Sequence, residues 1–232
     1  MTRKLQTIGF DADDTLWHNE RFFKLTQDRF EELLSDYTDK SLLHDRLIAA
    51  ERRNIGHYGY GVKGFVLSMI ETAIDVTEGA VEGHVIQKIL DAGQDMLAHP
   101  IELLPHAQST IEALSGSHRL VLITKGDLLH QERKLAQSGL GDLFDDVAIV
   151  SDKTVETYRS IFTGHPGGAE AAMMVGNSMR SDVVPAVQAG AWGVFVPHDL
   201  AWDLEHAEPP EAPRYRAIGD LGDLLPLVDE IG

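Results

Sequence analysis

The chain has 232 residues, of which 43% are hydrophobic and 25% charged, as is typical of a globular protein with a sizeable buried core. Its formal net charge of −17 argues against nucleic-acid or anionic-membrane partners, because both require clustered cations. The absence of cysteine excludes disulfides, thiolate metal sites and cysteine nucleophiles. Since the N-terminal sequence lacks the apolar stretch of a signal peptide and no transmembrane run is present, we expect a cytoplasmic protein.

A short apolar run that ends in three acids opens the chain. Residues 4–10 have the pattern of a buried strand, and Asp11, Asp13 and Asp14 follow it directly, before Thr15. Carboxylates crowded at a strand end repel one another unless a cation, a substrate charge or a shared proton offsets the repulsion. The stretch is therefore either a functional acidic site or a solvated turn that caps a helix.

The next eighty residues have apolar side chains at helical spacing. Four amphipathic helices are expected, over residues 22–37, 42–48, 62–74 and 85–97. Residues 52–64 contain four glycines, three cations and two tyrosines, so we expect a loop there. It is either a flexible linker or a substrate-sensing loop in which Arg53 and Lys63 bind substrate.

From residue 100 onward, apolar runs alternate with helical patterns. Strands are expected at 119–124, 144–150, 172–176, 193–197 and 214–218, with helices between them. This alternation predicts an α/β fold with a Rossmann-like parallel sheet, which the first strand must join because it has no other partner. The expected domains are a catalytic core of residues 1–16 and 100–232 and an all-helical domain of residues 17–99, inserted after the first strand.

Polar residues of complementary kinds stand at four expected strand ends. They are Asp11 and Asp13, Thr124, Lys153, and Asn177 with Asp182. Because parallel strands end at one edge of a sheet, these groups can meet in one pocket. A nucleophilic aspartate needs a metal or a lysine to compensate its charge, and a second acid can move the proton. A threonine hydroxyl and a lysine ammonium can hold the oxygens of a phosphoryl group.

The arrangement resembles the haloacid dehalogenase superfamily over nearly the whole chain. Residues 10–16 match its first motif, an apolar strand followed by D-x-D-x-T, and residues 122–124 match its second, a strand ending in Ser or Thr. Lys153 matches the third motif, and residues 176–182 match the acidic fourth. The helical insertion resembles the C1-type cap of that superfamily.

The resemblance implies a role for each matched residue. Asp11 would form an aspartyl-phosphate, and Asp13 would be the general acid and base. Asp11, the backbone carbonyl of Asp13 and the fourth motif would bind Mg²⁺. Asn177 stands where the family often has an aspartate, so either Asn177 or Asp182 is the direct ligand. Thr124 and Lys153 would orient and neutralise the phosphoryl group.

Three charged residues near these motifs have roles that their positions in the sequence suggest. Asp14 is expected to hold the loop, and Lys125 competes with Lys153 as the phosphate-binding lysine. Lys134 falls in the middle of a helix and is expected on its solvated face.

Two aromatic positions follow the first motif. Trp17 is expected to pack at a hinge. His18 could bind substrate or have a hinge or surface role. The eleven histidines show no pair at metal-ligand spacing with a nearby acid, which argues against a zinc site.

These observations favour a Mg²⁺-dependent phosphomonoesterase that hydrolyses a small phosphorylated metabolite. One alternative is a 2-haloacid dehalogenase, but such enzymes typically lack the acid that corresponds to Asp13. A phosphomutase or other phosphotransferase would use the same pair of aspartates. A phospho-accepting signalling module is about half this length and has no helical bundle after its first strand.

Overall fold

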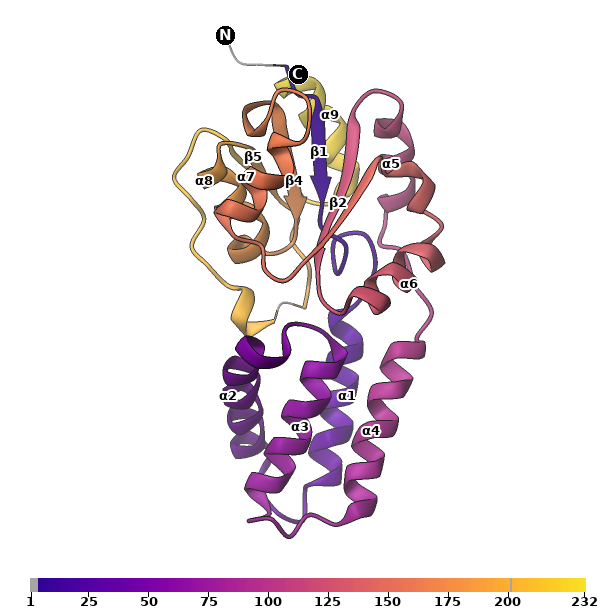
Figure 1. The fold of residues 1–232 in the computed structure, drawn as a ribbon, viewed down its shortest axis with the longest axis vertical. Helices are drawn as coiled ribbons and strands as arrows, with labels where there is room; N and C mark the ends of the chain where they lie inside the picture. Colours follow the sequence, from indigo (N-terminus) through magenta and orange to yellow (C-terminus); the bar gives the residue numbers. More distant parts are fainter. Residues whose placement is uncertain (1–3, 201) are drawn as a thin grey trace. The chain divides into compact units, whose positions relative to one another are not determined.

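The computed structural model describes residues 4–200 and 202–232. The chain divides into two compact units, coloured by sequence in Figure 1. The sheet unit contains the residues up to Glu20 together with Ile101–Lys125 and Gln131–Gly232. The helical unit contains Arg21–Pro100 and the short segment Gly126–His130.

The sheet unit is built on six parallel strands in the order β3-β2-β1-β4-β5-β6. Their bounds are β1 Thr7–Phe10, β2 Arg119–Lys125, β3 Asp146–Val150, β4 Ala172–Gly176, β5 Trp192–Phe195 and β6 Tyr215–Ala217. The predicted α/β fold with a parallel sheet is confirmed. Strand β1 is central, and the chain adds strands first on one side of it and then on the other. The carboxyl ends of β1 and β4 therefore mark the switch point at which open sheets bind ligands.

Helices cover both faces of this sheet. Side chains alternate along β2, so Leu120 and Leu122 face one core and Val121 and Ile123 face the other. The first core includes α5 and α9, and the second includes α7 and α8, as Figure 1 shows. The helices are α5 Ala107–Ser115, α6 Leu128–Ser138, α7 Val155–Thr163, α8 Val184–Ala189 and α9 Leu224–Ile231. The short helical turns are Gly141–Leu143, Ala169–Ala171, Met179–Val183, Asp203–Glu205 and Leu221–Asp223.

The helical unit is formed by four helices between β1 and β2. They are α1 Glu20–Leu33, α2 Lys40–Tyr58, α3 Val62–Val76 and α4 Gly83–Ala98. Their apolar stripes meet in a separate core that includes Phe30, Leu47 and Met69. Helices α3 and α4 approach closely, since a Cβ added at Gly93 would lie 2.4 Å from Val66. Among the described residues, no helix has the length and apolar character needed to cross a membrane.

The expectation of a loop over residues 52–64 is wrong. Helix α2 continues to Tyr58, and only residues 59–61 separate it from α3. Gly56 lies within α2 because a single glycine costs a helix only about 1 kcal/mol, which packing offsets. The chain turns at Gly59 and Gly61, whose φ angles are 73° and 115°.

Candidate active site

The acidic segment that follows β1 is fixed by the backbone of the sheet. The Asp11 N–H donates to the carbonyl oxygen of Val175 at 2.9 Å, which places Asp11 at the carboxyl end of both β1 and β4. The chain then turns tightly, since the Leu16 N–H donates to the carbonyl oxygen of Ala12 at 2.8 Å. This turn fixes the backbone from which the three acids project.

Lys153 joins two buried carboxylates from different strand ends. Its ammonium donates to Asp11 Oδ1 and, at 2.7 Å, to Asp182 Oδ1. The other Asp182 oxygen accepts from the Ser178 N–H at 2.9 Å. The side chains of Lys153 and Asp182 are almost completely buried, and that of Asp11 is 9% exposed. The structure thus brings together Asp11, Lys153 and Asp182, as the strand-end pattern predicted.

The electrostatics of this cluster centre on Asp11. Burial, helped by the Asp182 carboxylate, raises the pKa of Asp11 to about 7, although the attraction of Lys153 opposes this. The two carboxylates raise the pKa of Lys153 above its usual value, although burial opposes them. With all three groups ionised the cluster has one excess negative charge. A further cation beside Asp11 would therefore stabilise its ionised form.

Asn177 brings a third oxygen-rich group to the same place. Its terminal amide lies 3.2 Å from Asp11 Oδ2, 3.2 Å from the Asp13 carbonyl oxygen and 3.3 Å from Thr15 Oγ1. With the amide nitrogen toward these atoms, it donates to them. With the amide oxygen toward them, it accepts from the Thr15 hydroxyl but faces two further acceptors, Asp11 Oδ2 and the Asp13 carbonyl oxygen, an arrangement that a cation stabilises. Carboxylate and carbonyl oxygens are the donors that Mg²⁺ prefers, so the residues present fit this ion.

Asp13 pairs with Lys134, a lysine that the sequence did not place in the site. Lys134 Nζ lies 2.8 and 2.9 Å from the two Asp13 oxygens, and its side chain is only 8% exposed. Trp17 Nε1 also donates to Asp13, at 2.7 Å. Burial pushes the pKa of Asp13 upward, but the Lys134 ammonium and these hydrogen bonds hold it below its usual value. The expectation that Lys134 lies on a solvated helix face is wrong.

Gln131 is a second residue of α6 that the sequence analysis missed. Its amide nitrogen donates to Thr124 Oγ1 at 2.6 Å and to Asp13 Oδ2 at 3.2 Å. Thr124 is almost completely buried at the end of β2. Gln131 therefore fixes the predicted phosphate-binding hydroxyl relative to the predicted acid and base.

Lys125 is engaged with an acid from a distant loop. Its ammonium lies 2.5 Å from Glu205 Oε1 and 2.7 Å from Ser181 Oγ. Glu205 also accepts from the hydroxyls of Ser178 and Ser181. Burial raises the pKa of Glu205, but Lys125 and these hydroxyls outweigh it and lower the pKa. Lys153, and not Lys125, contacts Asp11, as expected if Lys153 is the lysine of the third motif.

The remaining predicted substrate-binding residues are not part of this cluster. Arg53 lies on α2 and pairs with Glu71 at 2.5 Å, and Lys63 pairs with Asp127 at 3.1 Å, all within the helical unit. His18 lies in the sheet unit beside the His198 ring. The assignment of Arg53, Lys63 and His18 to substrate stays a prediction.

Asp14 has a structural role at the start of α1. Its φ angle is 60°, in the left-handed region that aspartate tolerates better than most residues. Its carboxylate accepts from the N–H groups of Asn19 at 2.8 Å and Glu20 at 2.9 Å. These contacts satisfy donors at the helix start, and burial raises the pKa of Asp14 to about 6. The loop-holding role expected for Asp14 agrees with this geometry.

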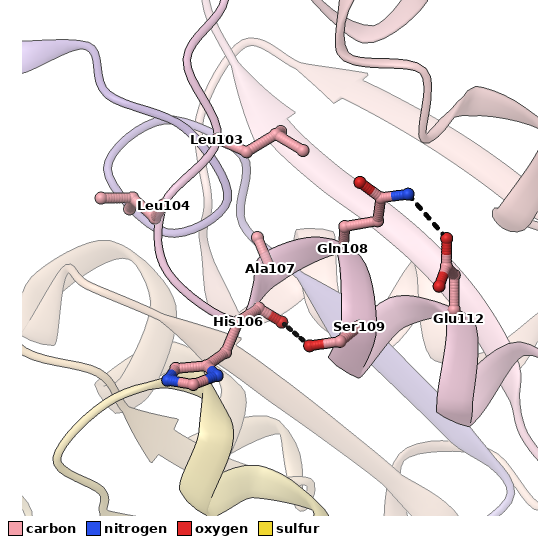
Figure 2. Close-up of a pocket in the computed structure, with 7 residues that line it drawn as sticks. All are labelled: Leu103, Leu104, His106, Ala107, Gln108, Ser109 and Glu112. Carbon is pink, nitrogen blue, oxygen red and sulfur yellow. Dashed lines mark hydrogen bonds between the residues drawn. The ribbon is translucent and has the colours of Figure 1, made fainter.

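A surface hollow of the sheet unit lies at the start of α5. Figure 2 shows its lining, which is Leu103, Leu104, His106, Ala107, Gln108, Ser109 and Glu112. Its polar groups bond to one another, since Gln108 donates to Glu112 at 2.8 Å and Ser109 donates to the His106 carbonyl at 3.2 Å. None of the predicted catalytic residues lines it, so the hollow is not the candidate site.

The fold and the Asp11–Lys153–Asp182 cluster are those expected of a haloacid dehalogenase-like hydrolase. Residues 5–190 match the family model of haloacid dehalogenase-like hydrolases. The chain belongs to this family, and the resemblance noted from the four motifs is confirmed.

Two curated relatives are phosphate-ester hydrolases by name. The chain is 23% identical to the glyceraldehyde 3-phosphate phosphatase of Methanothermobacter thermautotrophicus over 217 residues, which cover 88% of this chain and 91% of that protein. It is 27% identical to the pyrimidine 5'-nucleotidase YjjG of Escherichia coli over 131 residues. That match covers 53% of this chain and only 55% of the nucleotidase.

Solved structures share the fold over almost the whole chain. A haloacid dehalogenase-like family hydrolase from Xanthomonas campestris superposes with a TM-score of 0.87 and 40% identity, covering 97% of this chain and 92% of that one. The HAD-hydrolase YfnB from Bacillus subtilis, solved bound to magnesium, has a TM-score of 0.69 and 18% identity, covering 98% and 100%.

Replacing Lys134 with Met should raise the pKa of Asp13 and destabilise the protein by about 1–3 kcal/mol at neutral pH, because the carboxylate loses its charged partner. The folded-state pKa of Asp13 lies below its usual value of 3.8, so its ionised carboxylate stabilises the fold above pH 3.8. This stabilisation is lost as pH falls through the folded-state pKa. Denaturant unfolding at several pH values should therefore show a difference that shrinks in acid. Lys24→Met, at an exposed pair with Asp28, is the control and should change stability by less than about 0.5 kcal/mol. An equal effect of both variants at every pH would contradict the assignment.

Proposed function

We propose that this protein is a Mg²⁺-dependent phosphomonoesterase that hydrolyses a small phosphorylated metabolite through an aspartyl-phosphate on Asp11. The observation that carries the proposal is the buried Asp11 carboxylate, held by Lys153 on one side and facing the Asn177 amide on the other. A carboxylate fixed in this way is positioned as a nucleophile. Asp13 follows it by two residues, on the same turn, and supplies the acid and base.

In the first step an Asp11 oxygen attacks phosphorus, and the bond from phosphorus to the leaving oxygen breaks. Asp13 donates its proton to that oxygen, so the alcohol leaves neutral. Asp13 must carry a proton beforehand, and Lys134 opposes this by favouring the ionised form. A bound phosphate dianion raises the pKa of Asp13 through like-charge repulsion, so proton uptake accompanies substrate binding.

In the second step Asp13, now ionised, removes a proton from water. The water oxygen bonds to phosphorus, the bond from phosphorus to Asp11 breaks, and inorganic phosphate leaves. The Lys153 ammonium and the Thr124 hydroxyl bind the non-bridging oxygens in both steps, which stabilises the charge that they share in the transition state.

The ligands proposed for Mg²⁺ are Asp11, the carbonyl oxygen of Asp13, and Asn177. When bound there, Mg²⁺ neutralises and orients the phosphoryl oxygens. Asn177 is the better candidate ligand, because its amide lies 3.2 Å from both Asp11 Oδ2 and the Asp13 carbonyl oxygen, whereas Asp182 contacts Lys153 and the Ser178 N–H. We assign Asp182 to positioning Lys153.

The carboxylate of Asp13 favours phosphate chemistry over dehalogenation. A halide leaves without a proton, so a dehalogenase has no need of this acid. The names of the two curated relatives point to phosphate esters as well. A phosphotransferase and a phospho-accepting signalling module would also use Asp11, but neither releases inorganic phosphate over many turnovers.

Asp11→Asn should abolish phosphate release from a generic aryl phosphate in the presence of Mg²⁺, because an amide is a poor nucleophile. The measurement is inorganic phosphate produced over many turnovers, with circular dichroism to confirm the fold. Asp28→Asn, on the exposed face of α1, is the matched control and should retain wild-type turnover. Retained activity in Asp11→Asn would contradict the nucleophile assignment, and single-turnover phosphate release by the wild type would favour a signalling module.

Removing Mg²⁺ with a chelator should abolish turnover, and adding Mg²⁺ back should restore it. Asn177→Ala should raise the Mg²⁺ concentration for half-maximal activity about tenfold or more, since one ligand is lost. Gln87→Ala, on the exposed face of α4, is the control and should leave that concentration unchanged. Turnover that persists in excess chelator would contradict the proposed metal requirement.

A further inference from the structure

A second group of metal-ligating side chains lies outside the Asp11–Lys153–Asp182 cluster. Asp14, His18 and His198 each present one donor atom, and the three atoms lie within 4.8 Å of one another. In residues 4–200 and 202–232 no other group of three histidine or acidic side chains is so closely placed. All three residues belong to the sheet unit.

Hydrogen bonds and a direct contact with each other position the Asp14 and His198 side chains. The Asp14 carboxylate is fixed by the N–H groups of Asn19 and Glu20 and is only 6% exposed. The His198 side chain is 11% exposed, and its Nε2 lies 3.5 Å from Asp14 Oδ1. The rings of His18 and His198 are 5.9 Å apart, at 64° to each other. Imidazole nitrogens from two segments therefore converge on one buried carboxylate.

The other nitrogen of His198 indicates which atom is free to ligate. His198 Nδ1 lies 2.8 Å from the Leu200 carbonyl oxygen and 3.3 Å from the Leu200 N–H. The shorter contact requires a proton on Nδ1, which places the lone pair of the neutral ring on Nε2, toward Asp14. A backbone carbonyl that accepts from the outer nitrogen is the usual partner of a metal-binding histidine. A lone pair facing a carboxylate is unfavourable unless a proton or a cation lies between them.

We propose that Asp14, His18 and His198 bind a divalent transition-metal ion, with Zn²⁺ as the best match. Two imidazole nitrogens and one carboxylate oxygen suit Zn²⁺, whereas Mg²⁺ prefers oxygen donors. Three protein ligands leave a fourth position for water. The ion would join the segment that leads from β1 into α1 to the segment that follows β5. This site is distinct from the Mg²⁺ site proposed above and does not depend on it.

The spacing of the histidines along the chain does not indicate this site. His18 follows β1 and His198 follows β5, so their proximity comes from the sheet, in which only β4 separates these strands. Asp14 was already assigned to the helix start, and it performs that role with oxygens that retain further lone pairs.

The test is calorimetric titration of Zn²⁺ into the metal-stripped full chain, with excess Mg²⁺ present to occupy oxygen-rich sites. We expect one equivalent of Zn²⁺ per chain. Binding should weaken about tenfold or more in His18→Ala and in His198→Ala. His84→Ala removes an exposed histidine that pairs with Glu82 on the surface, and is the matched control that should bind as the wild type does. Asp11→Asn should also retain binding.

Cobalt provides a second readout that does not involve turnover. Co²⁺ bound to the wild type should show the visible absorption of a nitrogen-ligated ion, and both His18→Ala and His198→Ala should lose it while circular dichroism stays unchanged. Absence of stoichiometric Zn²⁺ binding by the wild type would overturn the proposal and leave a direct contact between His198 and Asp14. Binding that survives both histidine substitutions, or that disappears in Asp11→Asn, would overturn it as well.

Discussion

The contact of Lys153 with Asp11 and Asp182 is the constraint on which the rest of the site depends. Two carboxylates almost completely withdrawn from water repel each other, and one ammonium between them offsets that repulsion. The contact requires that the ends of β1, β3 and β4 lie at one edge of the sheet, which the parallel order provides. Since the cluster retains a net negative charge, its own electrostatics favour a cation beside Asp11.

Each of the two aspartates Asp11 and Asp13 is paired with a lysine of its own. Lys134 lies on α6 and pairs with Asp13, whereas Lys153 follows β3 and pairs with Asp11. Burial dominates at Asp11 and raises its pKa, whereas at Asp13 the Lys134 ammonium and the hydrogen bonds from Trp17 and Gln131 together outweigh burial and lower the pKa. Two carboxylates separated by a single residue thus differ in pKa because their partners and exposure differ. Each shift runs against the proposed role, since a nucleophile must be ionised and an acid must hold a proton. The proposed chemistry therefore requires a cation beside Asp11 and a phosphate dianion near Asp13, which oppose the two shifts.

Much of the fold and the centre of the site could be predicted from the sequence. Apolar runs predicted the strands of the sheet, and polar residues within a few positions of the strand ends predicted that Asp11, Lys153 and Asp182 would lie close together. These predictions held because parallel strands end at one edge, so that position along the chain implies position in space.

The residues that were missed do not follow strand ends. Gln131, Lys134 and Leu135 are spaced i, i+3 and i+4, so they share one face of α6, and that face is buried. The charge of Lys134 by itself favours a solvated position, whereas its neighbour Leu135, on the same face of α6, indicates a buried one. Glu205 ends the helical turn Asp203–Glu205, which is too short to show a periodicity, and its contact with Lys125 is purely tertiary. The loop expected over residues 52–64 was wrong because glycine composition outweighed the packing that holds α2 together.

The most direct test of the central claim is to trap the phosphorylated chain. Asp13→Asn can accept a phosphoryl group on Asp11 from an activated aryl phosphate but lacks the base for water attack. Intact-mass analysis after mixing with Mg²⁺ and substrate should show the added mass of one phosphoryl group, and peptide mapping should place it on Asp11. An unmodified chain that still releases phosphate, or a phosphoryl group on any other residue, would contradict the account.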